Sequence, residues 1–166
     1  MSSGEDAPPE QARPSVFLSY SRADQERVRV LVEALERAGL QVWWDDQIEG
    51  GAAYAKAIET ALQASDAVIV AWSAHSVGSD WVLDESAHGR DMKKLVPLSL
   101  DGTEPPLGFR QYQAIPLQFP HGRIDDASLQ AVLRAVLPLA GREAVPRPVA
   151  RSNAAHDALR RRLLAG

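Results

Sequence analysis

Cysteine and long apolar runs are both missing from this 166-residue chain. The absence of cysteine excludes thiol catalysis, thiolate metal sites and a disulfide framework. No apolar stretch approaches the roughly 18 residues needed to span a bilayer. The N-terminal segment Met1–Gln11 lacks a basic region followed by an apolar one, so we expect no signal peptide. Cytoplasmic residence is therefore the expected location.

Positive charge is scarce where the folded part is expected. The net charge of −4 divides into −2 over residues 1–14, −6 over 15–140 and +4 over 141–166. Neutralising nucleic-acid phosphates requires clustered Lys and Arg, so the acidic middle argues against nucleic-acid binding by the folded core. We interpret the Arg-rich end as a solvated tail, with contact to an anionic surface as the alternative.

The length and composition are those of one domain with tails. Hydrophobic residues make up 45% of the chain and charged residues 24%, which is ordinary for a globular protein. We expect a disordered acidic tail over 1–13, a domain over 14–140, and a Pro- and Arg-rich linker over 141–166. A short helix is possible at Ala154–Leu164 in that last part.

Strand-like and helix-like patterns alternate along the expected domain. We expect strands at Ser15–Tyr20, Leu40–Trp44, Ala67–Trp72, Lys94–Leu98 and Ala114–Leu117. We expect helices after Asp24 to near Gly39, at Ala53–Gln63, from Ser79 or Asp80 to about Arg90, and at Asp126–Leu139. Such alternation predicts an α/β fold with a parallel sheet covered on both faces. Right-handed crossovers leave a five-stranded doubly wound sheet as the simplest topology.

Two local details can be tested against a structure. Ser21-Arg-Ala-Asp24 has the spacing of a capping box, in which the hydroxyl and the acid satisfy free backbone N–H groups. Trp43 and Trp44 point to opposite faces of a strand. We therefore expect one of them in the core, so that only the other can flank the polar loop Asp45–Gly51.

Four segments, in this order, are similar to those of the TIR (Toll/interleukin-1 receptor) family. They are Val16-Phe-Leu-Ser-Tyr-Ser21, Val42-Trp-Trp-Asp-Asp-Gln-Ile-Glu-Gly50, Ser79-Asp-Trp-Val-Leu-Asp-Glu85 and Pro105-Pro-Leu-Gly-Phe109. The resemblance covers about residues 14–140 and points to the bacterial-type, NAD-cleaving branch. It implies a flavodoxin-like fold, self-association through TIR surfaces, and either scaffolding or NAD hydrolysis.

The resemblance implies that Glu85 is the catalytic carboxylate and Trp81 its aromatic partner. These two residues are four apart, so they share one face of a helix. Ligands of doubly wound sheets sit beyond the carboxyl ends of the strands. The candidate substrate-binding residues are therefore Trp81 and four residues that follow strand ends: Tyr20, Ser21, Asp45 and Ser73.

Cleavage of NAD needs a placed carboxylate more than a general acid. Nicotinamide departs as a neutral group while positive charge develops on the ribose. Glu85 would stabilise that charge, and Trp81 would hold the pyridinium ring with about 0.5–2 kcal/mol. Attack by water gives ADP-ribose, and attack by the adenine or a ribose hydroxyl gives a cyclic product; both stay open. NAD is then a substrate, and no cofactor is expected.

A purely structural role is the alternative interpretation for these residues. Without the resemblance, Trp81 would be a packed aromatic and Glu85 a solvated acid. Ser19-Tyr20-Ser21 could be a plain strand end with a cap. Glu85 and His88 form an E-x-x-H pair, but a metal site of that kind needs a second pair that the sequence lacks, so we expect no metal. The alternative function is a non-catalytic TIR scaffold.

The loop Asp45–Gly51 is polar and glycine-containing, and aromatic residues flank it. In related hydrolytic domains this loop closes a neighbour's pocket. We therefore expect an assembly surface made by Trp44, Ile48, Gly50 and Tyr54. A head-to-tail contact of this kind does not close on itself and gives open strands or filaments. By analogy alone, the domain would belong to a larger chain or to a bacterial immune or virulence system.

Overall fold

The computed structural model describes residues 13–44 and 52–141. These residues form β1 (Ser15–Ser19), α1 (Gln25–Arg37), β2 (Gln41–Trp43), α2 (Ala52–Ala64), β3 (Ala67–Trp72), α3 (Asp80–Asp91), β4 (Leu95–Ser99), β5 (Ile115–Pro116) and α4 (Asp126–Val136). Short 3-10 helices lie at η2 (Arg22–Asp24), η3 (Pro120–Gly122) and η4 (Leu137–Ala140). The predicted order of elements is confirmed. None of the described helices combines the length and apolarity that a membrane crossing requires.

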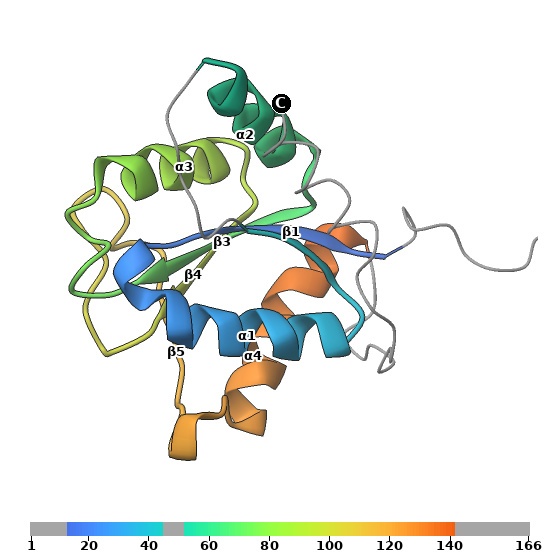
Figure 1. Ribbon diagram of the computed structural model, residues 1–166, viewed down its shortest axis with the longest axis vertical. Coiled ribbons are helices and arrows are strands. Elements are labelled where there is room, and N and C mark those ends of the chain that lie inside the picture. The colour runs from blue at the N-terminus through green and yellow to red at the C-terminus, as the bar shows by residue number, and fades with distance from the viewer. Residues whose placement is uncertain (1–12, 45–51, 142–166) are drawn as a thin grey trace, which may run out of the picture.

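The five strands form one parallel sheet in the order β2-β1-β3-β4-β5. Helices α2 and α3 lie on one face of it and α1 and α4 on the other (Figure 1). The predicted doubly wound α/β fold is therefore confirmed. In this topology the helices α1 and α3, which follow the neighbouring strands β1 and β3, leave the sheet toward opposite faces.

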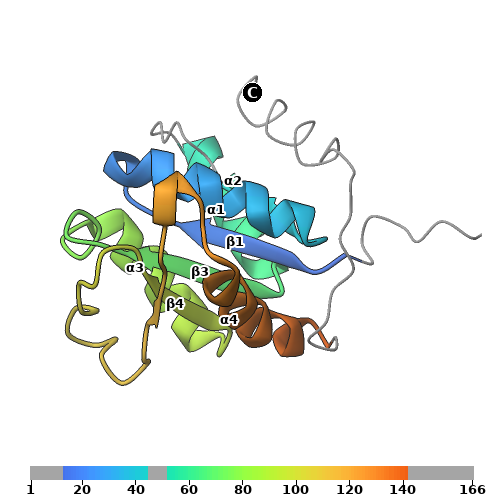
Figure 2. The ribbon, with the colours of Figure 1, turned by 90° about the horizontal axis from the view of Figure 1, so that it is seen from below.

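The face under α1 and α4, which Figure 2 views from the helix side, carries the larger part of the core. Val28, Leu31 and Leu35 recur at helical spacing on α1 and are fully buried against the sheet. α4 contributes Val132, Leu133 and Val136 to the same cluster. Burying each such side chain stabilises the fold by about 1.5–3 kcal/mol. This face is one continuous apolar layer.

The face under α2 and α3 holds two smaller apolar clusters. In the first, Phe17 of β1 stacks on Trp43 of β2, with ring centroids 4.9 Å apart and planes 10° apart. In the second, Trp72 of β3 packs against Phe109 from the loop after β4, with centroids 5.4 Å apart. The apolar layer here is interrupted, which leaves room for polar side chains.

Trp43 and Trp44 lie on opposite faces of the sheet, as the strand pleat predicts. The expectation that only one of them would be in the core is wrong, because both are buried, with 9% and 6% of their surface exposed. Trp44 packs against Tyr20 on the α1 face, with ring centroids 5.9 Å apart. The Arg29 guanidinium of α1 lies over the Trp44 ring. Trp44 is therefore unsuited to serve as an exposed docking residue.

The capping box predicted at Ser21–Asp24 is only half present. The Ser21 hydroxyl accepts a hydrogen bond from the N–H of Ala23 at the start of η2. The Asp24 carboxylate instead accepts a hydrogen bond of 2.5 Å from the Ser73 hydroxyl, which follows β3. A tertiary partner has replaced the local one.

Candidate functional site

Helix α3 carries the two residues that the sequence singled out most strongly. Ser79 is extended, with φ −89° and ψ 117°, and its hydroxyl accepts a hydrogen bond from the N–H of Val82. Such an N-cap satisfies a backbone donor that the first turn leaves free. Since α3 follows the carboxyl end of β3 through a short loop, its first turns lie at the ligand-binding edge expected of this fold. Trp81 and Glu85 lie in those turns.

Glu85 is a buried acid with a single well-defined partner in the sheet. Only 6% of its surface is exposed, and its Oε1 accepts a hydrogen bond of 2.6 Å from the Ser19 hydroxyl, 66 residues away in the chain. Ser19 is the last residue of β1 and is itself buried. The strand pleat places Ser19 on the same side as Phe17, facing α3, and Tyr20 on the other side.

Burial and, to a smaller extent, the nearby Asp84 carboxylate raise the pKa of Glu85 from 4.5 to about 8. Side-chain hydrogen bonds from Ser19 and Trp81 oppose this effect and lower the pKa of Glu85. Desolvation has the larger effect on the pKa, because the charged carboxylate loses its hydrating water and gains only two hydrogen-bond donors. At pH 7 the neutral acid predominates in the unliganded domain.

Trp81 is half-buried and serves both the core and the surface. Its inner part packs against the Phe17–Trp43 cluster. The remainder lines a groove of about 400 Å³ between α2 and α3. The indole is thus held in place by the fold and still accessible from the groove.

The groove is lined by acidic and apolar side chains from both helices, and most of the acids lie on α3. α3 contributes Trp81, Asp84, Glu85, Ala87, His88 and Asp91, and α2 contributes Ala55, Ile58, Glu59 and Leu62. No Lys or Arg is among these lining residues. An aromatic surface beside several carboxylates suits a flat, positively charged group. In the part of the chain that the structure describes, no three His, Cys, Asp or Glu side chains gather to hold a metal ion.

The structure does not bring Tyr20, Ser21 or Ser73 to this groove. Tyr20 faces the opposite side of the sheet and packs against Trp44. Ser21 caps η2. Ser73 is fully buried; its hydroxyl donates to Asp24 and accepts from the N–H groups of His75 and Ser76 at 3.1 Å each. Tyr20 faces away from the groove because consecutive strand residues point to opposite faces of the sheet. Ser21 and Ser73 stabilise the turns that follow β1 and β3.

Other predicted site residues fall outside the described part of the chain. They are Asp45, Ile48, Gly50 and the side chain of Tyr54. Conversely, sequence reasoning missed Ser19 as the partner of Glu85. The signal was present: Ser19 is a polar residue at the end of an apolar strand, two positions after Phe17 and so on the same face.

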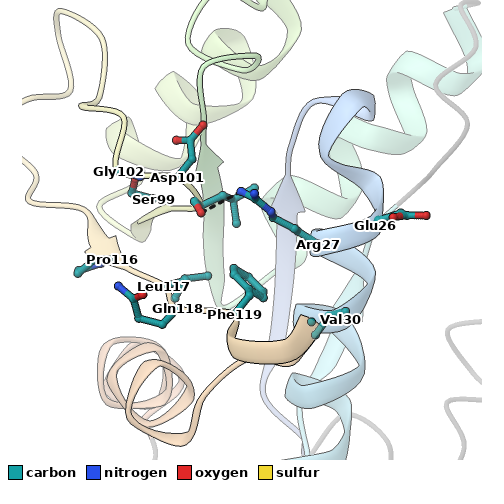
Figure 3. A pocket seen from close by; sticks show the side chains of 12 residues that line it. Glu26, Arg27, Val30, Ser99, Asp101, Gly102, Pro116, Leu117, Gln118 and Phe119 are labelled. Carbon is teal, nitrogen blue, oxygen red and sulfur yellow. Dashed lines mark hydrogen bonds between the residues drawn. The ribbon is translucent and has the colours of Figure 1, made fainter.

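A second, larger cavity of about 610 Å³ lies between α1, the loop after β4 and the segment from β5 to η3 (Figure 3). Arg27 reaches across it, and its Nη1 donates to the carbonyl of Leu100 at 3.1 Å. The Arg27 guanidinium also lies 6.0 Å from the centroid of the Phe119 ring. The charged lining residues Glu26, Arg27 and Asp101 are all exposed. This cavity therefore has no counterpart of the buried Glu85–Ser19 pair.

Comparison with known proteins agrees with the fold. A family model described as "TIR domain" matches residues 16–133. A solved structure of the TIR domain of the Toll-related receptor TRR-2 from Hydra magnipapillata is similar with a TM-score of 0.54 and 23% identity, covering 61% of this chain and 82% of that one. A WrbA-like flavodoxin from Agrobacterium tumefaciens matches with a TM-score of 0.42 and 12% identity over 79% of this chain and 99% of that one, too distant to carry an argument. No curated protein matches the chain.

Proposed function

We propose that this chain, which belongs to the TIR domain family, cleaves NAD between nicotinamide and ribose, with Glu85 as the catalytic carboxylate. The observation that carries the proposal is the buried Glu85, held by Ser19 beside the half-exposed Trp81 at an open groove. A solvated acid on a helix surface would have neither this burial nor a hydrogen-bond partner on a distant strand. Carboxylates whose pKa is strongly raised in a cleft are candidates for chemistry.

In this mechanism the nicotinamide ring lies against Trp81 in the groove. The bond between the ribose C1′ and the ring nitrogen breaks, and its electron pair stays on nicotinamide, which leaves neutral. The positive charge left on the ribosyl group is stabilised by the ionised Glu85 carboxylate. Water then bonds to C1′ and releases a proton to give ADP-ribose, or an internal nucleophile closes a cyclic product.

The acidic lining of the groove favours binding of a substrate that carries a positively charged ring. Glu59, Asp84 and Asp91 attract the positive charge of the bound pyridinium ring. A cation bound near Glu85 also lowers the pKa of that carboxyl, because it favours the charged form. Substrate binding would therefore ionise the residue that the chemistry needs. Asp45, in the loop outside the described residues, stays a proposed substrate contact.

Self-association is the proposed means of activation. The loop Asp45–Gly51, through Ile48 and Gly50, would dock onto a second copy in an open head-to-tail arrangement. Trp44 is withdrawn from this surface because it is buried against Tyr20. Activity per molecule should then rise with protein concentration.

The alternative is a non-catalytic TIR scaffold, in which Glu85 would be a buried structural acid only. The deciding experiment incubates the purified chain with NAD over a wide range of protein concentration and separates the products by chromatography. Release of nicotinamide by the parent and not by Glu85→Gln supports cleavage. Equal, background release by both proteins at every concentration, with or without a crowding agent, would leave the scaffold as the function.

A further inference from the structure

Gly89 lies on α3 in line with the two residues of the proposed site. Trp81, Glu85 and Gly89 are successive fourth residues and form one stripe along the helix. Glycine disfavours helix relative to alanine, since it loses more backbone freedom and packs no side chain. Gly89 is buried in the last turn of α3, and the packing around it therefore holds the reason that a glycine is present.

The reason is a close approach between α3 and the central strand β3. A Cβ atom built on Gly89 would lie 2.8 Å from Cβ, 3.0 Å from Cγ1 and 3.2 Å from Cγ2 of Val68. Separations below 3.0 Å are shorter than van der Waals contact allows, so a methyl group there would force the two elements apart.

Val68 is fixed in the sheet and cannot move away from the helix. It is fully buried in β3, where it pairs with Phe17 of β1 on one side and Leu95 of β4 on the other. Its N–H donates to the carbonyl of Lys94 at 2.8 Å. The closest clash involves its Cβ, which is fixed to the strand backbone and does not move when the side chain rotates. The helix is therefore the element that would shift.

A shift of α3 acts directly on Glu85. The Glu85 carboxylate reaches past the helix to Ser19 on β1, which pairs with Val70 of β3. At 2.6 Å the hydrogen bond is already short, and lifting the helix from the sheet would stretch or break it. The same movement would let water reach a carboxylate that is now buried.

We propose that Gly89 is a positioning residue for Glu85: its missing side chain lets α3 lie close enough to β3 for the carboxylate to reach Ser19. The catalytic consequence rests on the proposed NAD cleavage, but the structural part does not. The ionisable groups that line the groove with Glu85 are Asp84, His88 and Asp91 of α3 and Glu59 of α2. β1 and β3 contribute no charged side chain. Asp84, His88 and Asp91 lie on the same helix as Glu85 and would move with it, so a change in the titration of Glu85 reports its distance from β1 and its access to water.

The test is a carboxyl carbon NMR titration of Glu85 in the full chain, with the signal assigned by its loss in Glu85→Gln. In Gly89→Ala we expect the midpoint to move down from near 8 toward the ordinary value of 4.5, because the carboxyl becomes hydrated. The matched control is Gly78→Ala, where an added Cβ meets nothing within 4 Å. Its titration should equal that of the parent.

A rescue variant keeps the test valid if Gly89→Ala folds poorly. Val68→Ala removes the two methyl groups that lie 3.0 and 3.2 Å from the added Cβ. The double variant Gly89→Ala/Val68→Ala should recover part of the parental midpoint. If NAD is cleaved, its rate should fall by about tenfold or more in Gly89→Ala and partly return in the double variant. A folded Gly89→Ala whose Glu85 titrates as in the parent would overturn the proposal, whether or not the parent cleaves NAD. If Gly89→Ala does not fold, a folded double variant with a fully parental midpoint would overturn it, because the added Cβ still lies 2.8 Å from the Cβ at position 68.

Discussion

The two faces of the sheet bury different things. Under α1 and α4 a single apolar cluster joins both helices to β1, β3 and β4. Under α2 and α3 the apolar layer is split in two, and Glu85 is buried against Ser19 beside an open groove. Apolar burial stabilises the first face, whereas a desolvated carboxyl costs free energy on the second. The first face maintains the fold, whereas the second holds the proposed site.

The sharpest way to test this division is to change Glu85 alone. Glu85→Gln keeps the shape of the side chain and removes the charge that would stabilise the ribosyl cation. We expect nicotinamide release to fall by roughly 10²–10³-fold or more, the size typical of losing one electrostatic contact in a transition state. The far-ultraviolet circular dichroism should stay that of the parent. A variant that cleaves NAD within a factor of two of the parent would contradict the assignment.

The stability of the fold should also depend on pH through Glu85. Its pKa is raised by burial to about 8 in the fold from 4.5, so the neutral acid is what the fold accommodates. The neutral Glu85 carboxyl contributes its full share to the free energy of unfolding below about pH 4.5, and this share is lost as pH rises through 8. Each unit of difference between the folded and unfolded pKa corresponds to about 1.4 kcal/mol.

Thermal melts of Glu85→Gln and the parent from pH 5 to 9 measure this contribution. The melting temperature of the variant, relative to the parent, should rise by several degrees across that range because glutamine does not ionise. A difference that is constant with pH would mean that Glu85 has an ordinary pKa in the fold.

The opposite face should respond in stability and not in chemistry. Leu31 is fully buried on α1, and Leu31→Ala should lower the free energy of unfolding by about 2–5 kcal/mol. Urea denaturation measures the loss. At low temperature the variant stays folded. Nicotinamide release per folded molecule should then be within about twofold of the parent, because Leu31 lies on the opposite face of the sheet and shares no partner with Glu85. A large loss of activity in the folded variant would break the division between the faces.

A smaller effect is expected at Ser19. Its hydroxyl donates to Glu85 and lowers the pKa of that carboxyl, so Ser19→Ala should raise the pKa. The rising limb of kcat/KM against pH, which reports the free protein, should therefore move to higher pH. The loss at pH 7 should be smaller than that of Glu85→Gln, because the carboxyl group is retained and only its pKa rises. An unchanged limb would show that Ser19 only fills space.

Sequence patterns were sufficient for most of what depends on neighbours along the chain, the capping box at Ser21–Asp24 being an exception. The alternating apolar runs predicted the element order and the doubly wound sheet, and Ser79 predicted the start of α3. The four-residue spacing of Trp81 and Glu85 placed both on one helix face and at one groove. Helical periodicity, strand alternation and N-capping are local properties, and for that reason they can be read from residues close together in the sequence.

Only the tertiary structure decided which distant side chains meet. Glu85 meets Ser19 across 66 residues, and Asp24 meets Ser73 across 49. The sequence placed Tyr20, Ser21 and Ser73 at one rim, but the strand pleat sends neighbouring residues to opposite faces of the sheet. How deep Glu85 lies depends on the distance between α3 and β3, which the contact of Gly89 with Val68 sets. Such contacts depend on the register of strands and the separation of packed layers, and these are determined only when the whole core is packed.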